Sequence, residues 1–236
     1  MTDVTAAGHA GLRSEIIATC SHMNAIGVNQ GASGNISVRV AANRFLITPS
    51  GIPYAAMTPA EIAEMRLDGV YYGPCRPSSE WRFHRDILAA RPEVNAVIHT
   101  HSMFSTTISC LRRDLPAVHY MISAAGGDSV RCAEYATFGT QQLSINALKA
   151  LEGRRACLLA NHGLIVLGDS LPKAMALVIE VETIAAQYWR ASCLGEPVIL
   201  DEAEMQRVID QFKTYGRQDA VDPELRHGGL IAPEAA

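Results

Sequence analysis

The chain has 236 residues, of which 48% are hydrophobic and 19% charged, so it can bury the core of one large α/β domain. Its net charge of −4 and its lack of a basic run give no support to nucleic acid or a membrane surface as a partner. No apolar run reaches membrane-span length, the N-terminus does not resemble a secretory signal and the six cysteines show no C-x-x-C spacing, so we expect a cytoplasmic protein with reduced thiols.

Helical and strand patterns alternate along the chain. Apolar spacing predicts a helix over residues 12–26, then two strands within 36–40 and 44–51, and a capping box in the TPAE sequence at 58–61. The remaining predicted elements are a helix over 79–90, a strand over 94–98, a helix over 140–151, two strands within 156–168, and helices over 170–194 and 202–212. Short strands between helices, without a repeat or a linker, predict one α/β domain with a mixed sheet over residues 1–217, followed by a flexible polar tail over 218–236.

Two histidines end the predicted strand in the stretch NAVIHTHS, residues 95–102. Side chains at i and i+2 of a strand lie on one face, about 6–7 Å apart, so His99 and His101 can each offer a ring nitrogen to one metal ion. His162, in the turn between the last two predicted strands, adds a third imidazole, and three such nitrogens suit catalytic zinc. The H-x-H pair alone is equally compatible with ordinary strand-end histidines.

A carboxylate or a water molecule should complete such a site, and Glu80 is the candidate carboxylate. It follows two serines in the first turn of a predicted helix, where an acidic residue also serves as a helix cap, so both interpretations stay open. His84, one helical turn later, is interpreted as a structural residue, with support of Glu80 as the alternative.

Three short polar loops combine backbone N–H groups with a hydroxyl or amide side chain, as a phosphate monoester site requires. They are SGN at 33–35, PSG at 49–51 and SS at 78–79. Each loop taken alone is more typical of a simple turn. The chain has no Walker loop and no Rossmann glycine fingerprint, so ATP and NAD lack support as ligands.

Together these motifs resemble the class II (zinc-dependent) aldolase family over residues 12–216, and within it the L-fuculose-phosphate aldolases. The segments that carry the resemblance are, in chain order, GNIS, LITPSGIPY, PSSEWRFH, HTH, HYMISAAGG, YATFGT, NHGLI and FKTYG. The resemblance implies a three-layer α/β fold in which a central mixed, largely antiparallel sheet is flanked by helices on both faces.

The resemblance also implies a site. One zinc ion per subunit, with cobalt or manganese as alternatives, would be held by His99, His101 and His162, with Glu80 in or near the fourth position. The implied phosphate site comprises Gly34, Asn35, Ser50, Gly51, Ser78 and Ser79. Tyr120 would reach the neighbouring subunit's site as an acid, and Tyr215 would close over the site, in a homotetramer with inter-subunit active sites.

The implied reaction is reversible cleavage of a ketose 1-phosphate, such as L-fuculose 1-phosphate, into dihydroxyacetone phosphate and an aldehyde. Breaking the C3–C4 bond leaves negative charge that must be delocalised as an enediolate, and zinc would stabilise that charge as a Lewis acid. Glu80 would serve as base and acid at C3, and Tyr120 would handle the proton of the C4 hydroxyl.

Several alternatives stay open within this resemblance. An aldolase for 5-deoxypentulose or 5-methylthioribulose 1-phosphate would release the same phosphate product, and the sequence does not specify the aldehyde pocket. Ribulose-phosphate 4-epimerases tend to carry aspartate at the position of Glu80, and methylthioribulose-phosphate dehydratases and phosphate-dependent decarboxylases differ in the HYM and FKTYG regions. A non-enzymatic module like the adducin head lacks the metal ligands, all four of which are present here.

Overall fold

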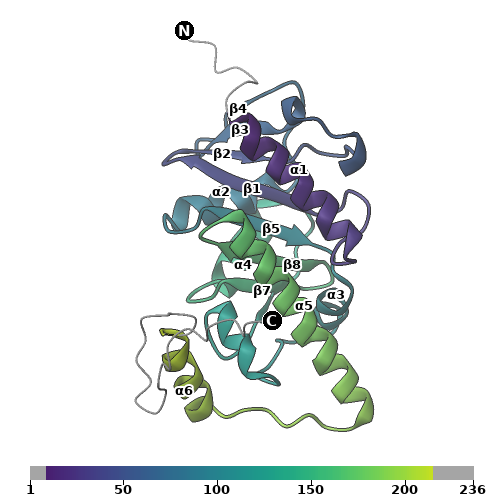
Figure 1. Cartoon of the computed structure of the whole chain (residues 1–236), viewed down its shortest axis with the longest axis vertical. Coiled ribbons are helices and arrows are strands. Elements are labelled where there is room, and N and C mark those ends of the chain that lie inside the picture. Colours follow the sequence, from purple (N-terminus) through teal and green to yellow (C-terminus); the bar gives the residue numbers. More distant parts are fainter. Residues whose placement is uncertain (1–8, 215–236) are drawn as a thin grey trace, which may run out of the picture.

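An eight-stranded sheet runs through the length of the molecule (Figure 1). The computed structural model describes residues 9–214. The strands are β1 (Asn35–Ala41), β2 (Arg44–Ile47), β3 (Ala63–Arg66), β4 (Tyr71–Tyr72), β5 (Ala96–Thr100), β6 (Arg131–Ala133), β7 (Ala156–Leu159) and β8 (Gly163–Gly168). Their spatial order is β4-β3-β2-β1-β5-β8-β7-β6, and every neighbouring pair is antiparallel except the parallel pair β6–β7. The expected mixed, largely antiparallel sheet is therefore confirmed.

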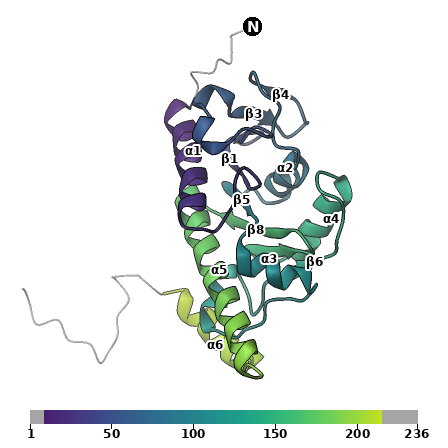
Figure 2. The same ribbon diagram turned by 90° about the vertical axis from the view of Figure 1, so that its right-hand side faces the viewer.

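Helices cover both faces of this sheet, as Figure 2 shows for α1 and α5 on one side and α2 and α4 on the other. The helices are α1 (Ala10–Ala25), α2 (Trp81–Ala90), α3 (Met103–Cys110), α4 (Gln141–Ala150), α5 (Leu171–Leu194) and α6 (Glu202–Phe212), with 3-10 turns at η1 (Tyr54–Ala56), η2 (Pro59–Glu61) and η3 (Tyr120–Ala125). One apolar cluster joins α1, α3, α5 and α6 to the sheet and a second joins α2 and α4 to the opposite face. The three-layer arrangement follows from these two cores.

Alternation along the strands assigns each side chain to one of the two layers. On β5, Ile98 belongs to the cluster beneath α5, whereas Val97 belongs to the cluster beneath α2. His99 continues the Val97 face, and its ring meets the ring of Phe83 from α2 edge-on at a centroid distance of 5.6 Å. The side chain of His99 therefore lies in the layer between the sheet and α2.

The structure meets one local expectation and corrects another. The capping box at Thr58 and Glu61 forms, but it begins only the single turn η2, because the chain returns to the sheet at β3. The helix expected from residue 79 begins at Trp81, so Glu80 is its N-cap residue and does not lie in its first turn. The predicted tail over 218–236 and Tyr215 lie outside the described residues. Within residues 9–214, no helix combines the length and apolarity that a bilayer span requires.

Candidate metal and substrate site

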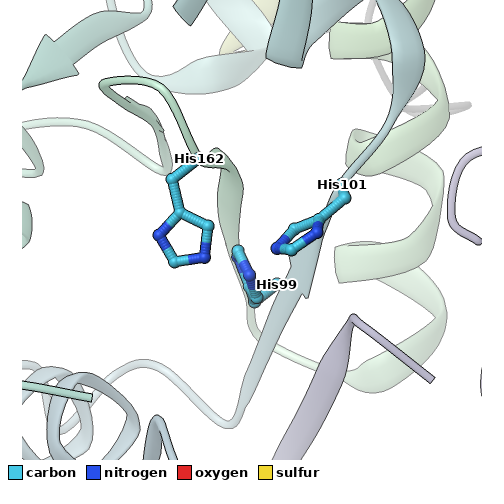
Figure 3. A group of neighbouring side chains, drawn as sticks. All are labelled: His99, His101 and His162. Carbon is cyan, nitrogen blue, oxygen red and sulfur yellow. The ribbon is translucent and has the colours of Figure 1, made fainter. Parts of the chain in front are cut away.

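Three histidine rings point toward one another at the end of the central strands (Figure 3). His99 is the penultimate residue of β5, His101 follows that strand, and His162 lies in the turn between β7 and β8. The three ring centroids are 4.8 to 5.0 Å apart, and one ligand atom from each ring lies within 4.8 Å of the others. The convergence expected from the H-x-H spacing and the third histidine is present.

The β7–β8 turn brings His162 to the end of β5. Strand β8 pairs with β5 so that Leu164 faces Thr100, and the residues just before β8 therefore lie beside the two strand-end histidines. Asn161 adopts the left-handed conformation, with a φ of 54°, which closes the turn. Gly163 packs so tightly that a Cβ there would lie 2.4 Å from the carbonyl oxygen of Thr100. A side chain at position 163 is thus excluded by the approach of the backbones.

Hydrogen bonding leaves ring nitrogens aimed at the cluster without partners. His99 donates from Nδ1 to the carbonyl oxygen of Leu164 at 3.0 Å, so its Nε2 carries a lone pair. Nε2 of His99, Nε2 of His101 and Oε1 of Glu80 are buried and have no hydrogen-bond partner. Burial of such groups without a partner costs about 1–3 kcal/mol each, and a bound cation would remove that cost. The donor set therefore fits a metal ion.

The protonation state of the rings fits the same use. Burial, reinforced by the neighbouring imidazoles, lowers the pKa of both His99 and His162 to about 3. Burial also lowers the pKa of His101. The rings are therefore neutral near pH 7, which is the form that ligates metals. The cluster of His99, His101 and His162 could hold a metal ion.

Glu80 directs its carboxylate at this cluster and not at its own helix. Its side chain makes no capping hydrogen bond to α2, although Glu80 is the N-cap residue. Oε2 lies 3.3 Å from Nε2 of His99, and Oε1 lies 3.3 Å from Nε2 of His162. The side chain is 5% exposed. Of the two interpretations left open by the sequence, the geometry favours the metal-site carboxylate over the helix cap.

A cavity of about 350 Å³ opens onto the cluster. Its wall is made of Ala32, Ser33, Ser79, Glu80, His101, Tyr135, Ala136, Phe138, Asn161 and His162. His99 is fully buried behind this wall. Tyr135 and Phe138 are more than half exposed and form an aromatic edge to the cavity. Neither ring was predicted to line the site, and the only sequence signal for them is their place in the YATFGT motif.

A second cavity, of about 370 Å³, contains three of the predicted phosphate-site serines, Ser50, Ser78 and Ser79. Ser79 lines both cavities, so the two spaces are neighbours. The backbone N–H groups of Ser50 and Ser78 already donate to the carbonyls of Arg76 and Thr48, and the Ser78 hydroxyl accepts a hydrogen bond from the backbone N–H of Glu80. Arg76 also lines this cavity. Sequence reasoning missed it because a lone cation in a loop carries no pattern.

Other predicted phosphate-site residues lie elsewhere. Gly34 and Asn35 are not among the residues that line either cavity. Gly34 packs on the β5 backbone, where a Cβ would lie 2.7 Å from the carbonyl oxygen of His99. Asn35 is buried and donates from Nδ2 to Oε2 of Glu80 at 2.9 Å. Gly51 follows Ser50 with a φ of +72°, a conformation that glycine adopts readily.

The predicted acid Tyr120 begins the 3-10 turn η3. It is 49% exposed, its ring stacks on His119 at a centroid distance of 4.8 Å, and it lines neither of the two cavities. Tyr215, the other predicted tyrosine, lies outside the described residues.

Comparison with known proteins gives concordant matches. The model of the family described as Class II Aldolase and Adducin N-terminal domain matches residues 14–189. The chain is 52% identical over 205 residues to a 5-methylthioribulose-1-phosphate/5-deoxyribulose-1-phosphate aldolase of Rhodospirillum rubrum, covering 87% of this chain and 92% of the relative. It is 46% identical over 206 residues to an L-fuculose phosphate aldolase of Escherichia coli, covering 87% and 95%. A solved L-fuculose 1-phosphate aldolase superimposes with a TM-score of 0.84 at 40% identity, covering 87% of this chain and 98% of that one.

Proposed function

The chain belongs to the class II aldolase and adducin N-terminal domain family, and from that premise we propose that it cleaves a ketose 1-phosphate reversibly into dihydroxyacetone phosphate and an aldehyde. The observation that carries the proposal is the convergence of three neutral imidazoles and one buried carboxylate at a cavity whose neighbour is lined by serine hydroxyls. An adducin-like module with no catalytic function gives no reason for this donor set.

The metal in this proposal is zinc, one ion per subunit, held by His99, His101 and His162 with Glu80 in or near the fourth position. Neutral imidazole nitrogens with a carboxylate are a donor set that zinc accepts, and cobalt or manganese are the alternatives. Zinc would act as a Lewis acid that stabilises negative charge on the C2 oxygen of the substrate. Three neutral histidines leave the positive charge of such an ion undiminished.

The protein's own groups move the protons. In the cleavage direction, the proton of the C4 hydroxyl passes through Tyr120 of the partner subunit to solvent, C4 becomes the aldehyde carbonyl, and the electrons of the C3–C4 bond pass into the enediolate. Glu80, which bound substrate would displace from the fourth position and which solvent protonates, then delivers a proton to C3, which completes dihydroxyacetone phosphate and returns Glu80 to its carboxylate form. The serines of the second cavity hold the phosphate and so orient the reacting carbons.

Replacement of Glu80 tests the proton transfer. Glu80→Gln keeps the size of the side chain and removes the base, so we expect turnover to fall by about 10²–10⁴-fold while binding of a phosphate-bearing inhibitor survives. Glu152→Gln, an exposed residue away from the cluster, is the matched control and should retain wild-type turnover. Near-normal turnover of Glu80→Gln would rule out Glu80 as the base.

Two kinds of ketose fit the proposal. L-fuculose 1-phosphate is supported by the relatives of that name, and 5-deoxyribulose or 5-methylthioribulose 1-phosphate by the 52% identical relative. Each would release an aldehyde with an apolar end, which suits the exposed rings of Tyr135 and Phe138 at the cavity edge. Release of dihydroxyacetone phosphate from each ketose phosphate, compared as kcat/KM, decides between them. Absence of release from all three would overturn the proposal.

The proposal includes a homotetramer whose sites lie between subunits. Exposure of Tyr120 and its separation from the cavities of its own chain support this arrangement. A mixture of Glu80→Gln and Tyr120→Phe subunits, each inactive alone, should rebuild about one quarter of the sites after random reassembly, because only some interfaces pair an intact glutamate with an intact tyrosine. No recovery in hybrids of verified composition would contradict shared sites.

We also propose a cytoplasmic location, which the six unpaired cysteines support.

A further inference from the structure

Four buried polar side chains form an unbroken line behind the histidine cluster. Ser37 Oγ lies 2.7 Å from Nδ1 of His84, and Nε2 of His84 lies 2.5 Å from Oδ1 of Asn35. Asn35 Nδ2 lies 2.9 Å from Oε2 of Glu80. Ser37 and Asn35 come from β1 and His84 comes from α2, and all of them are at most 4% exposed. Of these residues, the proposed reaction uses only Glu80 directly.

The Glu80 carboxylate, at the end of the line, sets the direction of every hydrogen bond in it. A carboxylate only accepts hydrogen bonds, so Asn35 must present its NH₂ group to Glu80 and its carbonyl oxygen to His84. His84 must then donate from Nε2, which leaves Nδ1 to accept from the Ser37 hydroxyl. Burial lowers the pKa of His84 well below its ordinary value, so the neutral ring has a single N–H for this purpose. This arrangement gives a partner to each atom through which Ser37, His84 and Asn35 face their neighbours in the line.

The two carboxylate oxygens of Glu80 consequently differ in their hydrogen bonding. Oε2 is held by Asn35, whereas Oε1 is buried without a hydrogen-bond partner. We infer that Ser37, His84 and Asn35 are positioning residues that hold Oε2 of Glu80, so that Oε1 is the atom that takes and returns the substrate proton. This inference rests on the proposed function and adds to it a use for His84, which the sequence left as a structural residue.

The step that depends on this line is proton exchange at one carbon of dihydroxyacetone phosphate. The C3–H bond breaks, its electron pair enters the enediolate, and the proton forms an O–H bond at Oε1; the reverse step returns a proton. A misplacement of the base by about 1 Å is enough to reduce such a rate about 100-fold. The line therefore acts on the maximal rate of exchange, whereas the phosphate loops act on the binding of the substrate.

The test measures hydrogen–deuterium exchange into dihydroxyacetone phosphate by NMR, with zinc-loaded enzyme and no aldehyde. His84→Leu should lower the maximal exchange rate about 10- to 100-fold and leave the KM within about 2-fold. His84→Gln should recover to within about 3-fold of the wild-type rate, since its amide can donate to Asn35 and accept from Ser37. Ser144→Ala, a buried serine that donates to Asp86 between α2 and α4, is the matched control and should exchange as the wild type does.

Two further measurements keep a folding defect apart from a positioning defect. The visible spectrum of the cobalt-loaded variants reports the histidine site, and thermal unfolding reports the fold; both should stay close to those of the wild type. If His84→Leu does not fold, Asn35→Ala carries the same test. A loss of rate at constant KM supports positioning, and a raised KM at constant rate shows a phosphate contact and overturns it.

The inference also fails if a folded His84→Leu or Asn35→Ala protein exchanges at the wild-type rate, or if His84→Gln is as slow as His84→Leu. Failure of the proposed function has a different signature. In that case the wild-type enzyme, loaded with zinc, does not exchange the hydrogen of dihydroxyacetone phosphate at all.

Discussion

Replacement of Gly163 by alanine should damage the histidine cluster although none of the three histidines is substituted. A Cβ at this position would lie 2.4 Å from the carbonyl oxygen of Thr100, 3.0 Å from Cδ2 of His101 and 3.2 Å from Cε1 of His99. The first of these neighbours is backbone, which cannot rotate away. Ordinary contact begins at 3.4 Å, so β5 and β8 must separate by about 1 Å at this point.

The size of the effect follows from what that separation breaks. Forced overpacking costs about 1–3 kcal/mol, and weakening of the adjacent ladder at Thr100 and Leu164 adds about 1 kcal/mol. The free energy of unfolding should therefore fall by about 2–4 kcal/mol. Leu164 also orients the ring of His99 through its carbonyl, and metal sites tolerate ligand displacements of only about 0.2 Å. Zinc affinity should fall at least about 10-fold.

Urea unfolding of the metal-free protein and calorimetric titration with zinc measure the two effects. Gly11→Ala is the matched control, because a Cβ there meets no atom within 4 Å and the residue lies within α1. This control should gain about 0.5–1 kcal/mol from helix propensity and bind zinc normally. A Gly163→Ala protein as stable as the wild type, with unchanged zinc affinity, would refute the close-packing argument.

Three further predictions concern the metal, the fold and the pH dependence of stability. A chelator should abolish aldol cleavage and added zinc or cobalt should restore it, and full activity in a sample shown by elemental analysis to be metal-free would contradict the metal assignment. Arg39→Met should lower the free energy of unfolding by about 2–4 kcal/mol in urea titrations, because the guanidinium donates to the carbonyls of Val94, Leu88, Arg91 and Ala42; a loss below 0.5 kcal/mol, roughly that of an ordinary surface substitution, would contradict it. Burial lowers the pKa of His84, so below about pH 6.5 the unfolded chain binds a proton at this residue that the folded chain does not. His84 should therefore lower the free energy of unfolding by about 1.4 kcal/mol for each pH unit below about 6.5, and should have no such effect above it. The slope of stability against pH between about 6.5 and 5 should be smaller by that amount in His84→Gln, and equal slopes would contradict it.

Much of the fold was predictable because its signals are local. The strand before His99, the turn before Gly163 and the long helix α5 all follow from periodicity and turn residues within a few positions. The capping box at Thr58, also a local signal, forms as predicted but begins only one 3-10 turn. A capping box states how a helix can begin, whereas its length depends on where the following residues pack, and here they enter the sheet as β3.

The candidate site likewise combines features that local sequence determines with features that depend on the tertiary structure. By itself the sequence determined the identity of the donors, the common face of His99 and His101 and the family, since these depend on residue type, spacing and motif order. Only the tertiary structure decided that Glu80 turns from its helix toward the histidines and that Asn35 and His84 stand behind it. Those contacts join residues 45 and 49 positions apart, and they exist because α2 packs on one face of the sheet, where buried polar groups must find partners among whatever the fold brings close.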